Sequence, residues 1–234
     1  MNSDINFHFL NHLRETQPDT YLGVIHILNQ RDADLKKGCH DIMNILSLIT
    51  GNYQLLCHNN PDIPDRDRFN LIGHDLKILT SMMNSIGEYR YAHNLTLSNV
   101  DMYEYLWDFA YSYRDSVIAN IPDTLPSLAI DRDKISFVMK SIVENVTDED
   151  VFATIKMDVS TEHNMLKISF ADELPAFDRE VRNNLFTIFN TNKKDHPGIS
   201  LATSYKILNA HRGSLSYSNN YPCGSIFTLW LPLQ

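Results

Sequence analysis

Apolar residues recur at alternating steps of four and three along the segment from residue 35 to residue 56. This spacing is the heptad pattern of a helix that packs against other helices, so it predicts a long helix over residues 31–58. The expected core seam of this helix consists of Leu35, Cys39, Ile42, Leu46, Ile49, Tyr53 and Leu56.

A second helix is expected after a turn rich in proline, asparagine and aspartate, with Asp65 as its N-cap and its end near Tyr91. Two apolar stripes lie side by side on it, so it must be covered from two sides. One antiparallel hairpin cannot provide both covers, whereas two hairpins can do so as a four-helix bundle. We therefore predict a homodimer. The first stripe is Phe69, Ile72, Leu76, Leu79, Met83 and Ile86, and the second is Leu71, Ile78, Met82 and Tyr89.

The pattern changes near Leu95, where short apolar alternations appear between amphipathic segments. Polar caps at Ser98 or Asn99 and at Asp131 indicate the starts of two helices. The order of elements predicts an α/β sandwich in which helices cover one face of a sheet. The expected helices are 100–113, 134–146, 179–188 and 199–210, and the expected strands are 151–159, 165–171, 214–218 and 225–232.

The fold class that follows is α+β, and 234 residues are enough for two small domains. Residues 1–30 are expected to form an N-terminal helical extension. Residues 31–93 form the dimerisation hairpin, and residues 94–234 form the sandwich.

Composition excludes several classes of function. A net charge of −9 argues against a nucleic-acid-binding face, which needs clustered Lys and Arg. No stretch approaches the roughly 18 apolar residues of a membrane span, and the N-terminus does not resemble a signal peptide. Cys39, Cys57 and Cys223 form neither a CxxC pair nor a zinc spacing, so we expect no metal site and a reducing, cytoplasmic setting.

His40 follows a predicted seam position by one residue, so its ring points away from the core. Asp41 is adjacent, and Asn44 lies one helical turn later on the same side. A solvated surface pair is the plain explanation of a His-Asp dipeptide on a helix. The heptad context and the second domain favour instead a histidine that is presented to a partner.

The segment HDIMNILSLITGN, residues 40–52, resembles the H-box of two-component histidine kinases and histidine phosphotransferases. The similarity is greatest to phosphotransferases of the sporulation phosphorelay, and the chain also resembles those of the alphaproteobacterial cell cycle. The resemblance implies that His40 accepts a phosphoryl group, with Asp41 and Asn44 assisting. His74 also precedes an aspartate, but Ile78 stands one turn later and offers no polar group, so His40 is the preferred acceptor.

Residues 95–234 resemble the ATP-binding domain of histidine kinases and related ATPases. ISFVMKSIVENV is similar to the N-box and has Asn145 at the position of the magnesium ligand. FADELPAF is similar to the first glycine box and has Asp172 at the adenine-binding position. HPGISLATSYKILNAHRG is similar to the second glycine box, of which Gly198 survives.

Leu174, Ala176, His196 and Ser200 replace glycines of these two boxes. Glycine lets the backbone of a nucleotide loop approach its ligand and adopt positive φ. We therefore expect a vestigial nucleotide site, no required cofactor, and no appreciable binding of ATP with Mg²⁺.

These residues favour a histidine phosphotransferase, which relays a phosphoryl group between the aspartates of receiver domains through His40. Receiver domains of response regulators are then its partners, and no nucleic acid or membrane is involved. A soluble ATP-dependent sensor histidine kinase with a divergent nucleotide site is the first alternative. A non-catalytic, kinase-like binding protein is the second.

Overall fold

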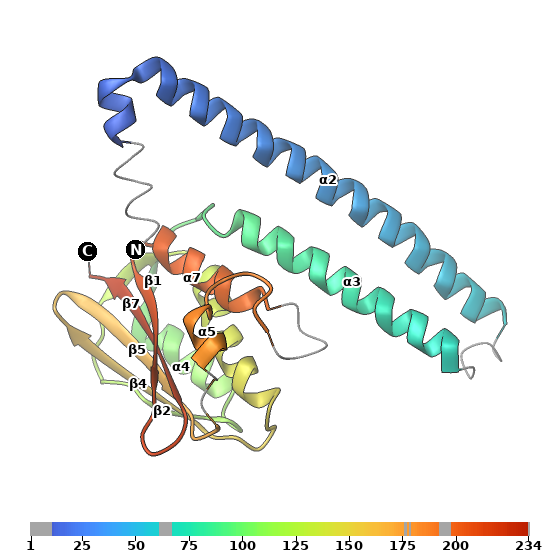
Figure 1. Cartoon of the computed structure of the whole chain (residues 1–234). Helices are drawn as coiled ribbons and strands as arrows, with labels where there is room; N and C mark the ends of the chain where they lie inside the picture. The colour runs from blue at the N-terminus through green and yellow to red at the C-terminus, as the bar shows by residue number, and fades with distance from the viewer. Residues whose placement is uncertain (1–10, 61–66, 176, 178, 192–197, 234) are drawn as a thin grey trace. The chain divides into compact units, whose positions relative to one another are not determined.

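The computed structural model describes residues 11–60, 67–175, 177, 179–191 and 198–233. The chain divides into two compact units, Met1–Met83 and Asn84–Gln234. The first unit is helical, and the second combines strands with helices (Figure 1). The division falls inside a helix, whereas the boundary expected from the sequence lies between residues 93 and 94.

Two long helices dominate the first unit. Helix α2 runs from Pro18 to Asn59, so it begins well before residue 31 and includes much of the expected N-terminal extension. Proline suits this start because the first turn of a helix does not need its missing N–H. Helix α3 runs from Asp67 to Tyr91 and ends where the sequence predicts. The expected cap at Asp65 lies outside the described residues.

The seam between α2 and α3 differs from the predicted one. Leu46 and Leu76 are each only 8% exposed, and Tyr53 stacks on Phe69 with 6.1 Å between the ring centroids. The shielded positions of α2 with four-three spacing are Cys39, Met43, Leu46, Thr50, Tyr53 and Cys57. The predicted seam residues that stay exposed within one chain are Leu35, Ile42, Ile49 and Leu56. The reason is that α2 is apolar on two flanks, and only one of them can face α3.

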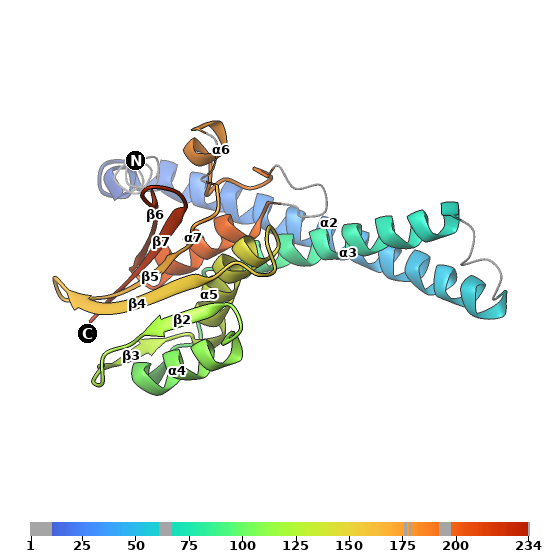
Figure 2. The same cartoon turned by 90° about the horizontal axis from the view of Figure 1, so that it is seen from below.

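The second unit is built on a five-stranded sheet with the order β2-β4-β5-β7-β6. Strand β2 pairs in parallel with β4, and the other neighbours are antiparallel. A separate antiparallel pair joins β1 to β3. Figure 2 shows β2 beside β4 at one edge of the sheet. The strands are β1 (Ser98–Asp101), β2 (Val117–Asn120), β3 (Ser127–Ile130), β4 (Ile155–Glu162), β5 (Met165–Ala171), β6 (Ser214–Asn219) and β7 (Ser225–Pro232).

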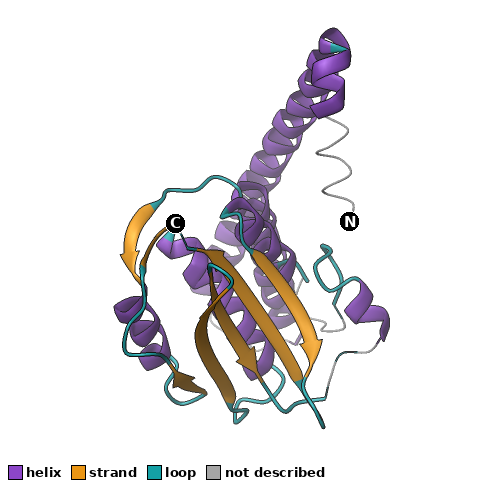
Figure 3. Cartoon of the chain, turned by 90° about the vertical axis from the view of Figure 1, so that its left-hand side faces the viewer, coloured by secondary structure: helices purple, strands orange, loops and turns teal. Residues whose placement is uncertain are grey.

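Helices cover one face of this sheet, as predicted. Alternate residues of β5 and β7 are buried, including Phe170 and Phe227, and they meet the apolar faces of the helices. Figure 3 looks onto the open face of the sheet with helices behind it. The helices are α4 (Met102–Ser112), α5 (Arg132–Thr147), α6 (Arg179–Asn183) and α7 (Ser200–Ala210).

Three local expectations need correction. The helix expected from residue 100 starts at Met102, because Ser98–Asp101 pairs with β3 and Asp101 supplies the cap instead of Ser98 or Asn99. Helix α6 ends at Asn183, earlier than expected. Strands β2 and β3 were not expected at all, because four-residue strands carry little periodicity. Asp131 caps α5 as predicted.

Among the described residues, no helix combines the length and the apolar character that crossing a membrane requires.

Candidate functional site

His40 lies on the exposed surface of α2, with its side chain 73% accessible. Its Nδ1 lies 3.2 Å from the amide nitrogen of Asn44 and 3.5 Å from a carboxylate oxygen of Asp41. The helix brings these groups together because Asn44 is one turn beyond His40. The structure therefore brings together the three residues that the sequence singled out on this helix.

The two neighbours of His40 bear on its tautomer. An imidazole nitrogen can attack an electrophile only if it carries no proton, so a nucleophilic Nε2 requires the proton on Nδ1. When ionised, the Asp41 carboxylate accepts hydrogen bonds and donates none. Its position beside Nδ1 therefore favours the tautomer that carries the proton on Nδ1. Rotation of the Asn44 amide would let its oxygen accept from the same N–H. Nε2 has no partner among the described residues.

A stripe of small and polar residues continues from His40 along the same face of α2, and it contains Asn44, Ser47 and Gly51. The Ser47 hydroxyl donates to the Met43 carbonyl at 2.8 Å, so it is already used within the helix. An added methyl group at Gly51 would meet no atom within 4 Å. The competing histidine, His74, is also exposed, on α3.

Asp172 follows β5 directly and is 4% exposed. One oxygen of its carboxylate accepts the backbone N–H of Leu174 at 2.9 Å and of Ser225 at 3.3 Å. Burial raises the pKa of Asp172, and the charge of Glu149 acts in the same direction, whereas the two N–H donors oppose them.

Sequence reasoning missed the groups that hold Asp172 in place. The Asn220 amide donates to the Asp172 carbonyl at 2.8 Å, and the Asp172 N–H donates to the Ser225 carbonyl at 3.0 Å. Gly224 has a φ of +115°, and a methyl group there would overlap the Asp172 carbonyl oxygen. A glycine between two strands was the available signal, because close backbone approach requires one.

The other residues of the expected nucleotide site lie on neighbouring elements. Asn145 is half-buried near the end of α5, along which α7 packs. Gly198 precedes α7 with a φ of +64°, and its carbonyl accepts the N–H of Phe189 at 3.0 Å. Ser200 is the first residue of α7.

Two of the four glycine replacements, Ala176 and His196, lie outside the described residues. Leu174 was expected to place its side chain where a nucleotide loop approaches its ligand. Instead, that side chain is half-buried and packs against the core, so the loop does not present it wholly outward. The described residues contain no cluster of three or more His, Cys, Asp or Glu side chains that could hold a metal ion.

Residues 130–234 match the family of histidine kinase-, DNA gyrase B-, and HSP90-like ATPases. The signal transduction histidine-protein kinase AtoS of Escherichia coli is 22% identical over 205 residues, which cover 83% of this chain and 34% of AtoS. The chain spans 21% to 34% of the length of the curated relatives that it matches.

Solved structures show the same fold. Full-length ShkA in complex with AMPPNP gives a TM-score of 0.70 at 19% identity, over 87% of this chain and 45% of ShkA. Histidine kinase ThkA in complex with response regulator protein TrrA gives a TM-score of 0.58 at 17% identity, over 97% of this chain and 67% of that one. Residues 130–234 are thus similar to an ATPase domain of this family, and the chain is similar to histidine kinases.

Proposed function

We propose that this chain is a two-component signalling protein in which His40 accepts a phosphoryl group and passes it on. The geometry of His40 carries this proposal: Nδ1 faces Asp41 and Asn44, and Nε2 is open to a donor. The likeness to AtoS and to other sensor kinases supports the same class of protein.

Phosphoryl transfer to His40 requires one accessible imidazole nitrogen and a defined position for the proton on the other. The Nε2 lone pair attacks phosphorus in line, an N–P bond forms, and the bond to the leaving oxygen breaks with its electron pair on that oxygen. The ring becomes cationic as this happens, and the Asp41 carboxylate stabilises or removes the proton on Nδ1. Transfer from His40 to a receiver aspartate reverses these steps.

ATP is the donor that the comparisons favour, because residues 130–234 match an ATPase family. When bound, ATP would supply its γ-phosphoryl group. Asp172 would hold the adenine, and Asn145 would contribute to the magnesium site. The inward packing of Leu174 supports this assignment, since it removes one of the obstacles that the sequence suggested.

Relay between receiver aspartates, as in a phosphotransferase, is the second candidate. It is favoured by the loss of glycine at positions of the two glycine boxes, of which Ser200 lies within the described residues and begins α7. Burial also raises the pKa of Asp172 and so disfavours its ionised form. The ionised form is the one that would accept a hydrogen bond from adenine.

Receiver domains of response regulators are the proposed partners under either donor. The ThkA structure contains a response regulator, and this supports the proposal by analogy. We also propose that the chain forms a homodimer through α2 and α3.

One experiment separates the candidates. The purified chain is incubated in parallel with Mg²⁺ and radiolabelled ATP, and with a panel of phosphorylated receiver domains. We expect an acid-labile, base-stable label on the protein, as a phosphoramidate requires. His40→Ala should abolish it, and His74→Ala is the matched control that should retain it. Asn44→Ala should change the rate without abolishing labelling.

The donor follows from which incubation gives the label. Labelling by ATP, with saturable ATP binding by calorimetry, identifies a kinase. Labelling by receivers alone identifies a phosphotransferase. If neither donor labels His40, the proposal fails and a non-catalytic binding protein is the better explanation.

A further inference from the structure

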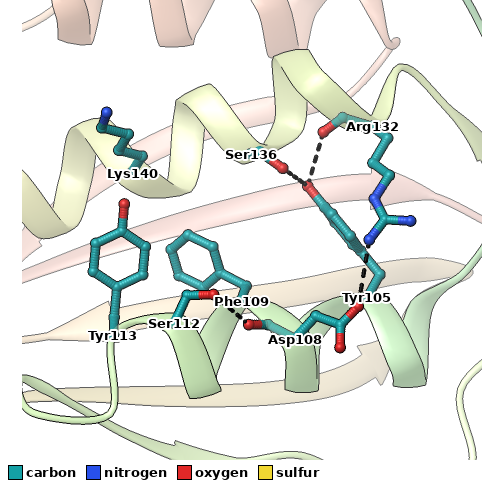
Figure 4. Close-up of a pocket in the computed structure, with 8 residues that line it drawn as sticks. All are labelled: Tyr105, Asp108, Phe109, Ser112, Tyr113, Arg132, Ser136 and Lys140. Atoms are coloured by element: carbon teal, nitrogen blue, oxygen red, sulfur yellow. Dashed lines mark hydrogen bonds and ion pairs between the residues drawn. The ribbon is translucent and has the colours of Figure 1, made fainter.

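A cleft of about 290 Å³ lies between α4 and α5 in the second unit (Figure 4). Its walls come from α4, from Tyr113 at the end of α4, and from one face of α5. The α5 residues are Arg132, Ser136 and Lys140, which are spaced one turn apart. The cleft therefore lies along two helices that are otherwise packed on the core.

Hydrogen bonds hold one end of the cleft in shape. Tyr105 is 3% exposed, its hydroxyl donates to the Arg132 carbonyl at 3.0 Å, and the Ser136 hydroxyl lies 2.8 Å away. Ser136 and Ser112 are small residues on facing helices, so they leave space that larger side chains would fill. The space is therefore formed before any ligand arrives.

The floor of the cleft is aromatic. Phe109 is 8% exposed, and its ring lies 4.8 Å from that of Tyr113 at an angle of 39°. Aromatic rings attract further rings in offset or edge-on arrangements. The floor thus offers a surface for one flat ring.

Cationic groups stand at both ends. Arg132 and Lys140 are eight residues apart, which is about 12 Å along a helix. Arg132 is held by Asp108 at 3.4 Å and by the Tyr105 ring. Lys140 pairs with exposed Glu144 at 3.5 Å, and such a surface pair is easily exchanged for another anion.

The Tyr113 hydroxyl lies at the Lys140 end and has no hydrogen-bond partner among the described residues (Figure 4). Burial raises the pKa of Tyr113, so this hydroxyl stays protonated and can donate. An anionic group at this end would meet the ammonium of Lys140 and the hydroxyl of Tyr113.

We propose that this cleft binds a small aromatic carboxylate, with its ring on Phe109 and Tyr113 and its carboxylate toward Lys140. The volume of about 290 Å³ lies just below the usual range for ligand pockets, which suits a single ring. Among the residues that line the cleft, two cations stand against the single carboxylate of Asp108, which favours an anion over a cation. The exposed Glu144 lies outside the lining, and a bound carboxylate takes its place beside Lys140.

The test uses the full chain and benzoate as the probe, with binding followed by saturation-transfer NMR. We expect saturable binding with a Kd of about 1 mM, as suits a ligand of this size. Lys140→Gln should weaken binding about tenfold through loss of a charged hydrogen bond. Tyr113→Phe should weaken it about threefold, because only a neutral donor is lost.

Lys156→Gln is the matched control, since Lys156 is also exposed and also pairs with a glutamate, Glu173 at 3.4 Å. It should leave the affinity unchanged, and both lysine variants should keep the thermal stability of the parent. Benzyl alcohol and cyclohexanecarboxylate should each bind more weakly than benzoate, because one lacks the charge and the other the aromatic ring.

The proposal is overturned if benzoate does not saturate, or if the two lysine variants lose affinity equally. If cyclohexanecarboxylate binds as tightly as benzoate, the proposed need for an aromatic ring is wrong. If benzyl alcohol binds as tightly as benzoate, the proposed need for a negative charge is wrong.

Discussion

His211 and Asp131 form a buried contact between two helices of the second unit. His211 follows α7, and its Nδ1–H donates to the Ile207 carbonyl at 2.8 Å, while its Nε2 accepts the N–H of Asp131 at 3.0 Å. The Asp131 carboxylate also accepts the N–H of Lys134 and of Thr96. His40 has the opposite environment, since it is exposed with one nitrogen open. Only the neutral imidazole of His211 satisfies both of its bonds, which suits structure rather than catalysis.

The stability of the second unit should therefore fall in mild acid. Burial lowers the pKa of His211, although the Ile207 carbonyl and the Asp131 charge act against it. Below an ordinary histidine pKa of about 6.5, the unfolded chain therefore binds a proton at this residue more readily than the folded chain does. The contribution of His211 to the free energy of unfolding is therefore complete above that pH. It is lost as the pH falls toward the pKa of His211 in the folded state.

Urea unfolding at several pH values between about 7 and 5 measures this dependence. His211→Gln should lower stability at neutral pH and flatten the pH dependence, whereas exposed His40→Ala should keep the slope of the parent. Equal slopes in the parent and in His211→Gln would contradict the assignment.

At the scale of elements, glycines occupy two different kinds of position. Gly213 links α7 to β6, and its N–H donates to the Leu208 carbonyl at 2.8 Å. A methyl group there would overlap the carbonyl oxygen of Trp230 in β7. Gly87 lies in α3, where a methyl group would meet no atom within 4 Å.

Alanine should consequently have opposite effects at these two positions. Gly213→Ala should destabilise the chain by about 1–3 kcal/mol, because backbone atoms must move. Gly87→Ala should stabilise it by about 0.5–1 kcal/mol, because alanine loses less conformational freedom in a helix. Thermal and urea unfolding of both variants measure the effects. A loss of stability at Gly87 as large as that at Gly213 would count against this account.

At the scale of the whole molecule, α2 and α3 of a single chain expose apolar side chains that the proposed homodimer would cover. They recur at three-, four- and seven-residue steps, as expected for a second helical seam. Burying each would contribute roughly 1.5–3 kcal/mol. They include Ile42, Ile45, Ile49 and Leu56 on α2, and Ile72 and Leu79 on α3.

Two aspartate substitutions should separate folding from assembly. Ile49→Asp places a charge on the exposed flank, so it should convert the dimer to a monomer that keeps its helix content. Leu46→Asp places the charge between α2 and α3 and should unfold the hairpin itself. Light scattering and circular dichroism at micromolar concentration distinguish these outcomes. Gln54→Asp, on another face of α2, should leave the dimer intact, and a monomeric parent protein would refute the prediction.

Short-range patterns in the sequence determined much of this protein. The helical character of α2 and α3, the Asp131 cap and the closing strand pair all depend on residues within a few positions of one another. The exposure of His40 beside Asp41 and Asn44 belongs to this group, because helical periodicity alone sets it. Similarity of the second region to an ATPase domain was also readable from local motifs and is confirmed for residues 130–234.

Only the tertiary structure decided the features that depend on distant partners. It selected which apolar flank of α2 faces α3, turned Leu174 toward the core, and paired the short strand β2 with β4. It also joined His211 to Asp131, which are 80 residues apart. Each of these depends on which surfaces meet when the chain is compact, and the local pattern is the same for either choice.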